Sequence, residues 1–407
     1  MASRIIIFNA IALSFYFYAF WGFKHLIRGI DGRLGLGFQV AYWAICLLAL
    51  VGMFFVMSRM RNAHFGFWDK VMLVLFFITL ISAVLWSVFL LIDDVVRLFQ
   101  WVGSQFFTSS SSHSSGISRK SFLVKSGALV AGGVGAALTY GVVKGSHKYR
   151  VVNQKLIIKN LPEALKGLKI LQISDVHSGS FWNKQSVQQG IDLIKQQQAD
   201  IIFFTGDIVN NRAYEMHEYI DIFNQIKAPH GVFAVMGNHD YGEYLIPFDL
   251  EENKKDIATV HEKLGWDLLM NENRILTINN EKLAIVGVEN WGNKMHFQRY
   301  GDLNKALGDV DENWPTLLLS HDPSHWRGEV IPKFPQVDAM FSGHTHGMQF
   351  GIETGGFKWS PIKYIYKEWA GLYEEGNQKL YVNRGFGYLG FPGRFGIWPE
   401  ITVFELA

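Results

Sequence analysis

Three long stretches without a charged residue constrain the fold of this chain more than any other feature. They cover residues 5–23, 38–57 and 71–92. Each has about twenty residues, the length that an α-helix needs to cross the roughly 30 Å of hydrocarbon in a bilayer. Charged residues such as Lys24, Arg59 and Asp93 stand only at their ends, which is typical of membrane spans rather than of buried helices in soluble proteins. Residues 1–101 are therefore predicted to form three transmembrane helices.

The overall composition agrees with a membrane protein and disfavours nucleic acid as a partner. Of the 407 residues, 49% are hydrophobic, with 32 Phe and 13 Trp, which is rich for a wholly soluble chain. The 38 Lys and Arg against 36 Asp and Glu give a net charge of +2, so the basic excess of a nucleic-acid binder is missing. The single cysteine, Cys46, excludes an intramolecular disulfide and a zinc site built from cysteines.

A Ser-rich segment and a fourth apolar stretch come next. Residues 102–120 are predicted to be a linker, because they include a serine run that has no apolar groups to bury. Residues 121–148 are predicted to form a fourth transmembrane helix or an export-signal-like helix. Residues 118–125 resemble a twin-arginine export signal in which Lys120 takes the place of the second arginine.

The plainer interpretation is a fourth span whose Gly132, Gly133 and Gly135 allow close packing on a neighbouring helix. The positive charges beside the four spans are nearly balanced between the two sides, so they do not fix the orientation. The export-like segment favours a multi-pass protein of the cell membrane whose C-terminal domain is extracytoplasmic.

Residues 149–407 are predicted to form an α/β domain. Strand-like apolar runs alternate there with polar, helix-like stretches such as 184–197, 214–226 and 253–264. In α/β folds, ligands gather at the carboxyl ends of the strands.

Five strand-like runs end in side chains that bind metals. They are Asp175 and His177 after residues 170–174, Asp207 after 201–205, Asn238, His239 and Asp240 after 231–236, His321 after 316–320, and His344 and His346 after 337–342. Mixed carboxylate, imidazole and amide ligands suit Mn, Fe or Zn better than Ca. The sequence therefore predicts a transition-metal site at this edge of the domain.

The spacing of these residues suggests how they would meet. Asp175 and His177 are expected to alternate along an extended segment and so to project to one side, and His344 and His346 are expected to do the same. Asp207 follows a glycine that permits a tight turn, and its two carboxylate oxygens suit it to bridge a pair of ions.

These motifs, in this order, resemble those of the calcineurin-like metallophosphoesterases over roughly residues 165–407. The matching sequences are Asp175-Val176-His177, Gly206-Asp207, Gly237-Asn238-His239-Asp240, His321 and Gly343-His344-Thr345-His346. The resemblance implies a four-layer α/β sandwich, two mixed sheets flanked by helices, as the catalytic domain 149–407. The chain is also similar to the membrane-attached bacterial branch that includes UDP-2,3-diacylglucosamine pyrophosphatases and export-signal-bearing phosphodiesterases. Met348 departs from the glycine that relatives commonly have there.

The resemblance also implies the role of each site residue. Two divalent metal ions (Mn, Fe or Zn) are expected, one held by Asp175, His177, Asp207 and His346, and one held by Asp207, Asn238, His321 and His344. His239 is expected to face the leaving oxygen and either donate a proton or stabilise charge, oriented by Asp240, although Asp240 as a loop cap is the alternative.

Two arginines and several aromatic stretches near the C-terminus have two interpretations each. Arg384 and Arg394 either cradle a phosphate or pack beside aromatic rings. The aromatic residues within 357–369 and 386–392 form either an apolar pocket rim or part of the second sheet's core.

The expected function is a membrane-bound phosphohydrolase that cleaves a phosphodiester or pyrophosphate bond. Its expected partners are membrane lipids and a phosphorylated, lipid-linked substrate such as UDP-2,3-diacylglucosamine. A water-soluble substrate such as a cyclic nucleotide, or a catalytically silent membrane scaffold, is the alternative.

Overall fold

A computed structural model describes residues 2–59, 66–106, 118–159, 161–244, 249–295 and 297–407. The chain divides into two compact units, Met1–Tyr140 and Gly141–Ala407. Each unit has its own apolar core and is described by itself.

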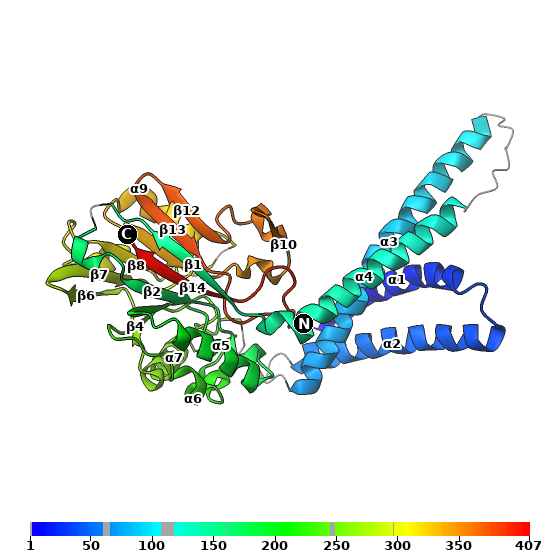
Figure 1. Ribbon diagram of the computed structural model, residues 1–407. Helices are drawn as coiled ribbons and strands as arrows, with labels where there is room; N and C mark the ends of the chain where they lie inside the picture. Colours follow the sequence, from blue (N-terminus) through cyan, green and yellow to red (C-terminus); the bar gives the residue numbers. More distant parts are fainter. Residues whose placement is uncertain (1, 60–65, 107–117, 160, 245–248, 296) are drawn as a thin grey trace. The chain divides into compact units, whose positions relative to one another are not determined.

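The first unit consists of four apolar helices (Figure 1): α1 (Ala2–Leu26), α2 (Gly32–Arg59), α3 (Phe67–Phe106) and α4 (Arg119–Val143), whose last residues belong to the second unit. All four are long and apolar enough to cross a membrane, as the sequence predicted. Helix α3 continues past residue 101, and α4 begins inside the segment predicted as a linker. The serine run of that linker lies outside the described residues.

Polar groups inside this unit bind one another, as a membrane environment requires. Tyr16 and Thr79 share a hydrogen bond of 2.8 Å between their hydroxyls, and Trp86 Nε1 donates to the Val124 carbonyl at 3.1 Å. The buried carboxylate of Asp93 contacts Arg97 Nε at 2.7 Å and Arg119 Nε at 3.1 Å. Arg119, the arginine of the export-like motif, therefore has a structural partner within the helix bundle.

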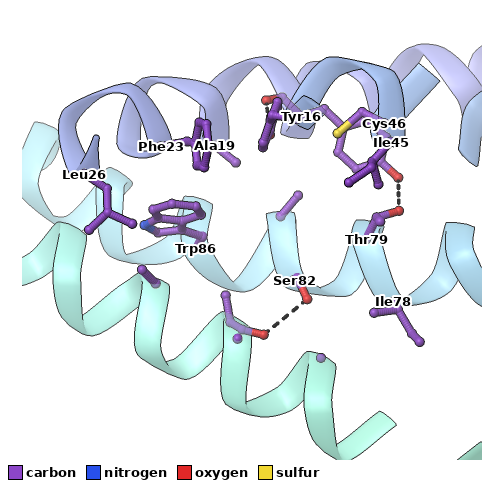
Figure 2. Close-up of a pocket in the computed structure, with 16 residues that line it drawn as sticks. Tyr16, Ala19, Phe23, Leu26, Ile45, Cys46, Ile78, Thr79, Ser82 and Trp86 are labelled. Atoms are coloured by element: carbon purple, nitrogen blue, oxygen red, sulfur yellow. Dashed lines mark hydrogen bonds between the residues drawn. The ribbon is translucent and has the colours of Figure 1, made fainter. Parts of the chain in front are cut away.

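An apolar cavity of about 390 Å³ lies among the four helices. Figure 2 shows it beside Tyr16, Cys46 and Trp86.

The three glycines of α4 that were predicted to allow close helix packing differ in their surroundings. A Cβ at Gly135 would lie 3.1 Å from Ser82 Oγ, whereas one at Gly132 or Gly133 would have no described atom within 4 Å. Only one of the three predicted glycines therefore allows a close helix approach.

The second unit contains two six-stranded mixed sheets. The first has the strand order β1 (Arg150–Leu156), β14 (Glu400–Leu406), β2 (Lys169–Ile173), β3 (Ile201–Phe204), β4 (Val232–Ala234) and β5 (Asp267–Leu268). The second has the order β12 (Gly371–Glu375), β13 (Gln378–Val382), β9 (Ala339–Ser342), β8 (Thr316–Leu319), β7 (Glu281–Gly287) and β6 (Glu272–Ile278). A separate hairpin pairs β10 (Ile352–Thr354) with β11 (Phe357–Trp359).

The two sheets pack face to face and carry helices on their outer faces (Figure 1). Phe341 lies between them, with its ring 5.0 Å from that of Phe203 and 5.0 Å from that of Phe404. The helices are α5 (Lys184–Gln196), α6 (Ile220–Phe223) and α7 (Leu250–Leu264) over the first sheet, and α8 (Leu303–Leu307) and α9 (Ile331–Lys333) over the second. This arrangement confirms the predicted α/β sandwich.

Parallel strands bring the predicted site residues to one edge. Strands β2, β3 and β4 are parallel in the first sheet, and β7, β8 and β9 are parallel in the second. Gln172 ties the two sheets together at this edge, because its Nε2 donates to Thr205 Oγ1 and to the Ser342 carbonyl, both at 3.0 Å. The loops that follow β2, β3, β4, β8 and β9 therefore converge.

Candidate metal centre

The loops turn sharply at the predicted ligands. Five of these residues have left-handed backbones, namely Asp175 (φ 53°), His177 (φ 48°), Asp207 (φ 59°), His344 (φ 72°) and His346 (φ 49°). The prediction that two of the pairs lie on extended segments is therefore wrong. Left-handed residues other than glycine each cost about 1–2 kcal/mol, and such strain concentrates at functional sites, where the surrounding structure holds it.

The first predicted ligand set is assembled. Ligand atoms of Asp175, His177 and His346 all lie within 4.8 Å of one another, and all three residues are buried. Asp175 Oδ1 is 3.2 Å from His346 Nε2, and Asp207 Oδ2 is 3.5 Å from His177 Nε2. Three of the four predicted ligands thus cluster, and the fourth, Asp207, contacts one of them.

The second predicted set shares Asp207 with the first. Its Oδ2 atom lies 3.1 Å from His321 Nε2. His344 Nδ1 in turn lies 3.3 Å from His321 Nε2 and 2.7 Å from Asn238 Oδ1. One oxygen of Asp207 therefore reaches both sets, which is the arrangement that a bridging carboxylate requires.

Two buried nitrogen atoms at the centre support a metal site. His177 Nε2 and His346 Nε2 make no hydrogen bond to any described residue although they are buried. Burial lowers the pKa of His177 to about 3 and that of His346 well below its usual value. Both imidazoles are therefore neutral near pH 7, and metal ligands among histidines must be neutral.

Electrostatics favour a cation at the shared oxygen. Burial lowers the pKa of His321, but the carboxylates of Asp207 and Asp175 outweigh it and raise the pKa to about 10. His321 Nδ1 donates to the Thr205 carbonyl at 2.7 Å, so Nε2 faces the cluster. The nitrogen and oxygen donors fit divalent Mn, Fe or Zn.

His239 lies beside the cluster and is half-buried. Its backbone N–H donates to Asp207 Oδ1 at 2.8 Å. Its Nδ1 lies 2.7 Å from the Asn210 carbonyl oxygen, and because a carbonyl only accepts, Nδ1 carries a proton. The half-buried ring, 5.0 Å from that of His177, therefore has Nε2 left for a ligand.

The Asp240 carboxylate binds backbone amides, whereas the His239 ring binds the Asn210 carbonyl. Asp240 Oδ2 accepts from the backbone N–H groups of Asp207 (2.8 Å) and Gly237 (2.9 Å). Its Oδ1 accepts from those of Ile208 (2.9 Å) and Val209 (3.3 Å). The predicted orienting role is therefore wrong. Asp240 instead clamps together the loops after β3 and β4, the loop-capping alternative.

Arg384 and Arg394 are also internal rather than phosphate-facing. Arg384 pairs with Glu400 and with Glu353. Arg394 is fully buried and donates to the carbonyls of Gly387 (2.8 Å), Arg384 (2.7 Å) and His346 (3.3 Å). Its Nη2 also lies 3.0 Å from His346 Nδ1. Both arginines instead bind acidic side chains or backbone carbonyls, and Arg394 also contacts the predicted metal ligand His346.

Several side chains at the site were missed because no motif marks them. Tyr366 Oη lies 2.9 Å from His344 Nε2 and donates to Asp322 Oδ2 at 3.3 Å. Tyr244 Oη accepts from Asn238 Nδ2 at 2.8 Å. Phe297, whose ring is 4.7 Å from that of His344, lines a cavity of about 470 Å³ with Gly292, Asn293, Met295 and Arg299. The only sequence signal was the aromatic stretch that contains Tyr366.

Two family models match adjacent parts of the chain. A model described as a probable calcineurin-like phosphoesterase transmembrane domain matches residues 3–146. The model of the calcineurin-like phosphoesterases matches residues 168–348, which include all the predicted metal ligands.

Curated relatives support the same assignment. The chain is 30% identical over 299 residues to the metallophosphoesterase YkuE of Bacillus subtilis, covering 71% of this chain and 98% of that protein. It is 25% identical over 279 residues to a zebrafish (Danio rerio) transmembrane protein with metallophosphoesterase domain, covering 65% and 58% respectively. A metallophosphoesterase of Helicobacter pylori is 29% identical over 243 residues, 59% of this chain and 60% of its own. The resemblance read from the motifs is confirmed, and the chain belongs to the calcineurin-like metallophosphoesterase family of metal-dependent phosphoesterases.

Proposed function

We propose that this protein is a membrane-bound hydrolase that uses two divalent metal ions to cleave a phosphodiester or pyrophosphate bond of a lipid-linked substrate. The observation that carries the proposal is the position of Asp207 Oδ2, 3.5 Å from His177 Nε2 and 3.1 Å from His321 Nε2. A single oxygen shared by two imidazole-containing sets is the mark of a two-ion site.

The site residues are proposed to act as metal ligands and as a proton donor. Asp175, His177, Asp207 and His346 would hold one ion, and Asp207, Asn238, His321 and His344 would hold the other. When bound, the ions supply Lewis acidity for the phosphoryl oxygens and lower the pKa of water toward neutrality. In its doubly protonated form, His239 donates the Nε2 proton to the leaving oxygen and becomes neutral, while Nδ1–H stays bound to the Asn210 carbonyl and fixes the ring. Asp240 keeps the loops of Asp207 and His239 in register through its four backbone contacts.

A catalytically silent scaffold is the weaker candidate. A metal-dependent fold becomes silent when its metal ligands are lost, yet every predicted ligand residue is present among the described residues, and Asp175, His177, Asp207, His321 and His346 form clusters. Metal analysis of the purified chain separates the two ideas, because a scaffold stays empty in Mn, Fe and Zn.

The first experiment tests the two-ion assignment on the full chain in detergent, with bis-p-nitrophenyl phosphate and added Mn, Fe or Zn. Asp207→Ala is expected to abolish metal-dependent turnover because both sets lose a ligand. His239→Ala is expected to keep both metals and to lose roughly 100- to 10,000-fold in rate on substrates with poor leaving groups. Wild-type turnover and metal content in Asp207→Ala would contradict the assignment.

The lipid-linked substrate is proposed because four helices that could span a membrane hold the domain where lipid headgroups are concentrated. The candidate is a lipid pyrophosphate such as UDP-2,3-diacylglucosamine, assayed beside simple phospholipids and cyclic nucleotides. If the enzyme hydrolyses water-soluble diesters faster, and an acyl chain on the substrate does not increase the rate, the proposal of a lipid-linked substrate is wrong.

The catalytic domain is proposed to lie on the extracytoplasmic face, on the strength of residues 118–125. The pairing of Arg119 with Asp93 gives that arginine a second role, so a direct test is needed. Fusions of alkaline phosphatase and of a fluorescent protein after Lys148 provide it, and cytoplasmic fluorescence without phosphatase activity would reverse the orientation.

A further inference from the structure

The β10–β11 hairpin turns its charged face toward the protein and its apolar face outward. The register pairs Glu353 with Lys358 and Thr354 with Phe357, so alternate residues point to opposite sides. Glu353 accepts from Arg384 Nη2 at 2.6 Å, and Lys358 Nζ donates to the Ala370 carbonyl at 2.5 Å. A hairpin that faces water normally has the reverse polarity.

The outward face of the hairpin is part of a larger apolar surface. Ile352 and Phe357 are 51% and 59% exposed, and Tyr364 is 75% exposed. We call the set the rim surface; it comprises Met348, Phe350, Ile352, Phe357, Tyr364 and Ile365, all exposed. Other aromatic residues of these stretches, such as Trp369 and Phe386, are buried. An exposed patch of large apolar side chains within one short segment marks an interaction surface.

The rim surface borders the metal centre at two points. The short helix that begins at the predicted ligand His346 ends at Gln349 and leads into β10. On the other side, Tyr366 contacts the predicted ligand His344 one residue after Ile365. The rim surface is therefore continuous along the chain with residues that are, or contact, the predicted ligands.

The rim surface also borders the end of the last apolar helix. The final residues of α4 belong to the catalytic unit, where Arg394 N donates to the Gly141 carbonyl at 3.1 Å. The next residue, Phe395, binds the residues just before β10 through two backbone hydrogen bonds. Its N–H donates to the Gln349 carbonyl (2.8 Å), and its carbonyl accepts from the Gly351 N–H (2.9 Å). A side chain at Gly141 would clash with the Arg394 carbonyl at 2.8 Å, so this contact is close.

We propose that the rim surface docks on the lipid bilayer and so turns the metal centre toward the phosphates of membrane-embedded substrates. Helix α4 is a candidate span, and backbone hydrogen bonds through Arg394 and Phe395 connect its last residues to the segment that carries the rim surface. Exposed Lys363 and Lys367 flank Tyr364, and aromatic residues mixed with lysine are typical of the headgroup region. The inference deepens the proposed function by saying how the site meets a lipid.

The test places a fluorescent reporter on the rim surface of the full chain. In a Cys46→Ala background, Phe357→Cys and Tyr364→Cys are labelled with an environment-sensitive dye and reconstituted into vesicles of phosphatidylcholine and phosphatidylglycerol. Glu281→Cys is the matched control, because Glu281 is exposed at the start of β7, at the sheet edge opposite the metal centre. Lipids that carry a spin label near the top of the acyl chain are expected to quench the two rim dyes at least twofold and to leave the control unchanged.

Two results would overturn the proposal. Rim dyes that are quenched no more than the Glu281→Cys control would show that the surface does not reach lipid. Cross-linking of two Phe357→Cys chains, without quenching, would assign the surface to a second copy instead. Turnover is measured separately on the same samples, so quenching without hydrolysis removes the proposed function alone, and hydrolysis without quenching removes this inference alone.

Discussion

Replacing Asp240 by asparagine separates the structural role of this carboxylate from the catalytic role that its sequence position suggested. The carboxylate accepts two backbone N–H groups on each oxygen, at 2.8 and 2.9 Å on Oδ2 and at 2.9 and 3.3 Å on Oδ1. An asparagine amide has only one acceptor oxygen, so at least two buried N–H groups lose their partner.

The expected magnitude follows from that count. Each buried, unsatisfied N–H group costs about 1–3 kcal/mol, so two of them lower the free energy of unfolding by about 2–6 kcal/mol. For a domain of this size the melting temperature falls by about 2–4 °C for each kcal/mol, which gives a fall of roughly 4–24 °C.

The assay is thermal unfolding of the full chain in detergent, followed by tryptophan fluorescence at a fixed metal concentration. His239→Ala is the control, because its half-buried side chain makes one hydrogen bond to the Asn210 carbonyl, and its loss costs about 1 kcal/mol. The smallest expected fall in melting temperature is roughly 4 °C. The reasoning is refuted if Asp240→Asn melts within 2 °C of wild type and yet loses turnover to the same extent as His239→Ala. That outcome would return Asp240 to the role of orienting the imidazole.

Three further substitutions test the surroundings of the metal centre. Tyr366→Phe removes the hydroxyl that contacts His344 Nε2 and is expected to weaken metal binding roughly 10- to 100-fold, measured by metal titration; an unchanged affinity would exclude this support. Arg394→Lys cannot satisfy all the carbonyls that the guanidinium reaches and is expected to destabilise the protein by about 3 kcal/mol or more without raising the substrate KM. A raised KM at unchanged stability would revive the phosphate-binding interpretation. Gly343→Ala places a methyl group against Ser174 and Asp175, so elemental analysis is expected to find less than the wild-type metal content, and full occupancy would show that the loop can adjust.

The sequence alone determined the features that depend on local pattern. A charge-free run of about twenty residues can satisfy its backbone in lipid only as a helix, so the apolar helices were predictable from residues 5–23, 38–57 and 71–92 alone. The convergence of the candidate ligands was predictable because parallel strands end at the same edge of a sheet, so polar side chains that follow buried strands lie close together. That rule brought Asp207 and His321 to within 3.1 Å although they are far apart in the chain.

Only the tertiary structure decided which partner each polar side chain has. Asp240 stands next to His239 in the sequence but binds amides about 30 residues earlier, because the loops after β3 and β4 lie side by side. The sequence left open that Arg384 binds phosphate, but in the structure Arg384 forms ion pairs with Glu353 and Glu400, which lie far from it in the sequence. The outward apolar face of the β10–β11 hairpin likewise depends on a distant contact, because the ion pair of Glu353 with Arg384 orients the charged face of the hairpin toward the protein. The physical reason is that a side chain's hydrogen-bond and ion-pair partners are set by contacts between distant segments, which the local spacing of residues does not encode.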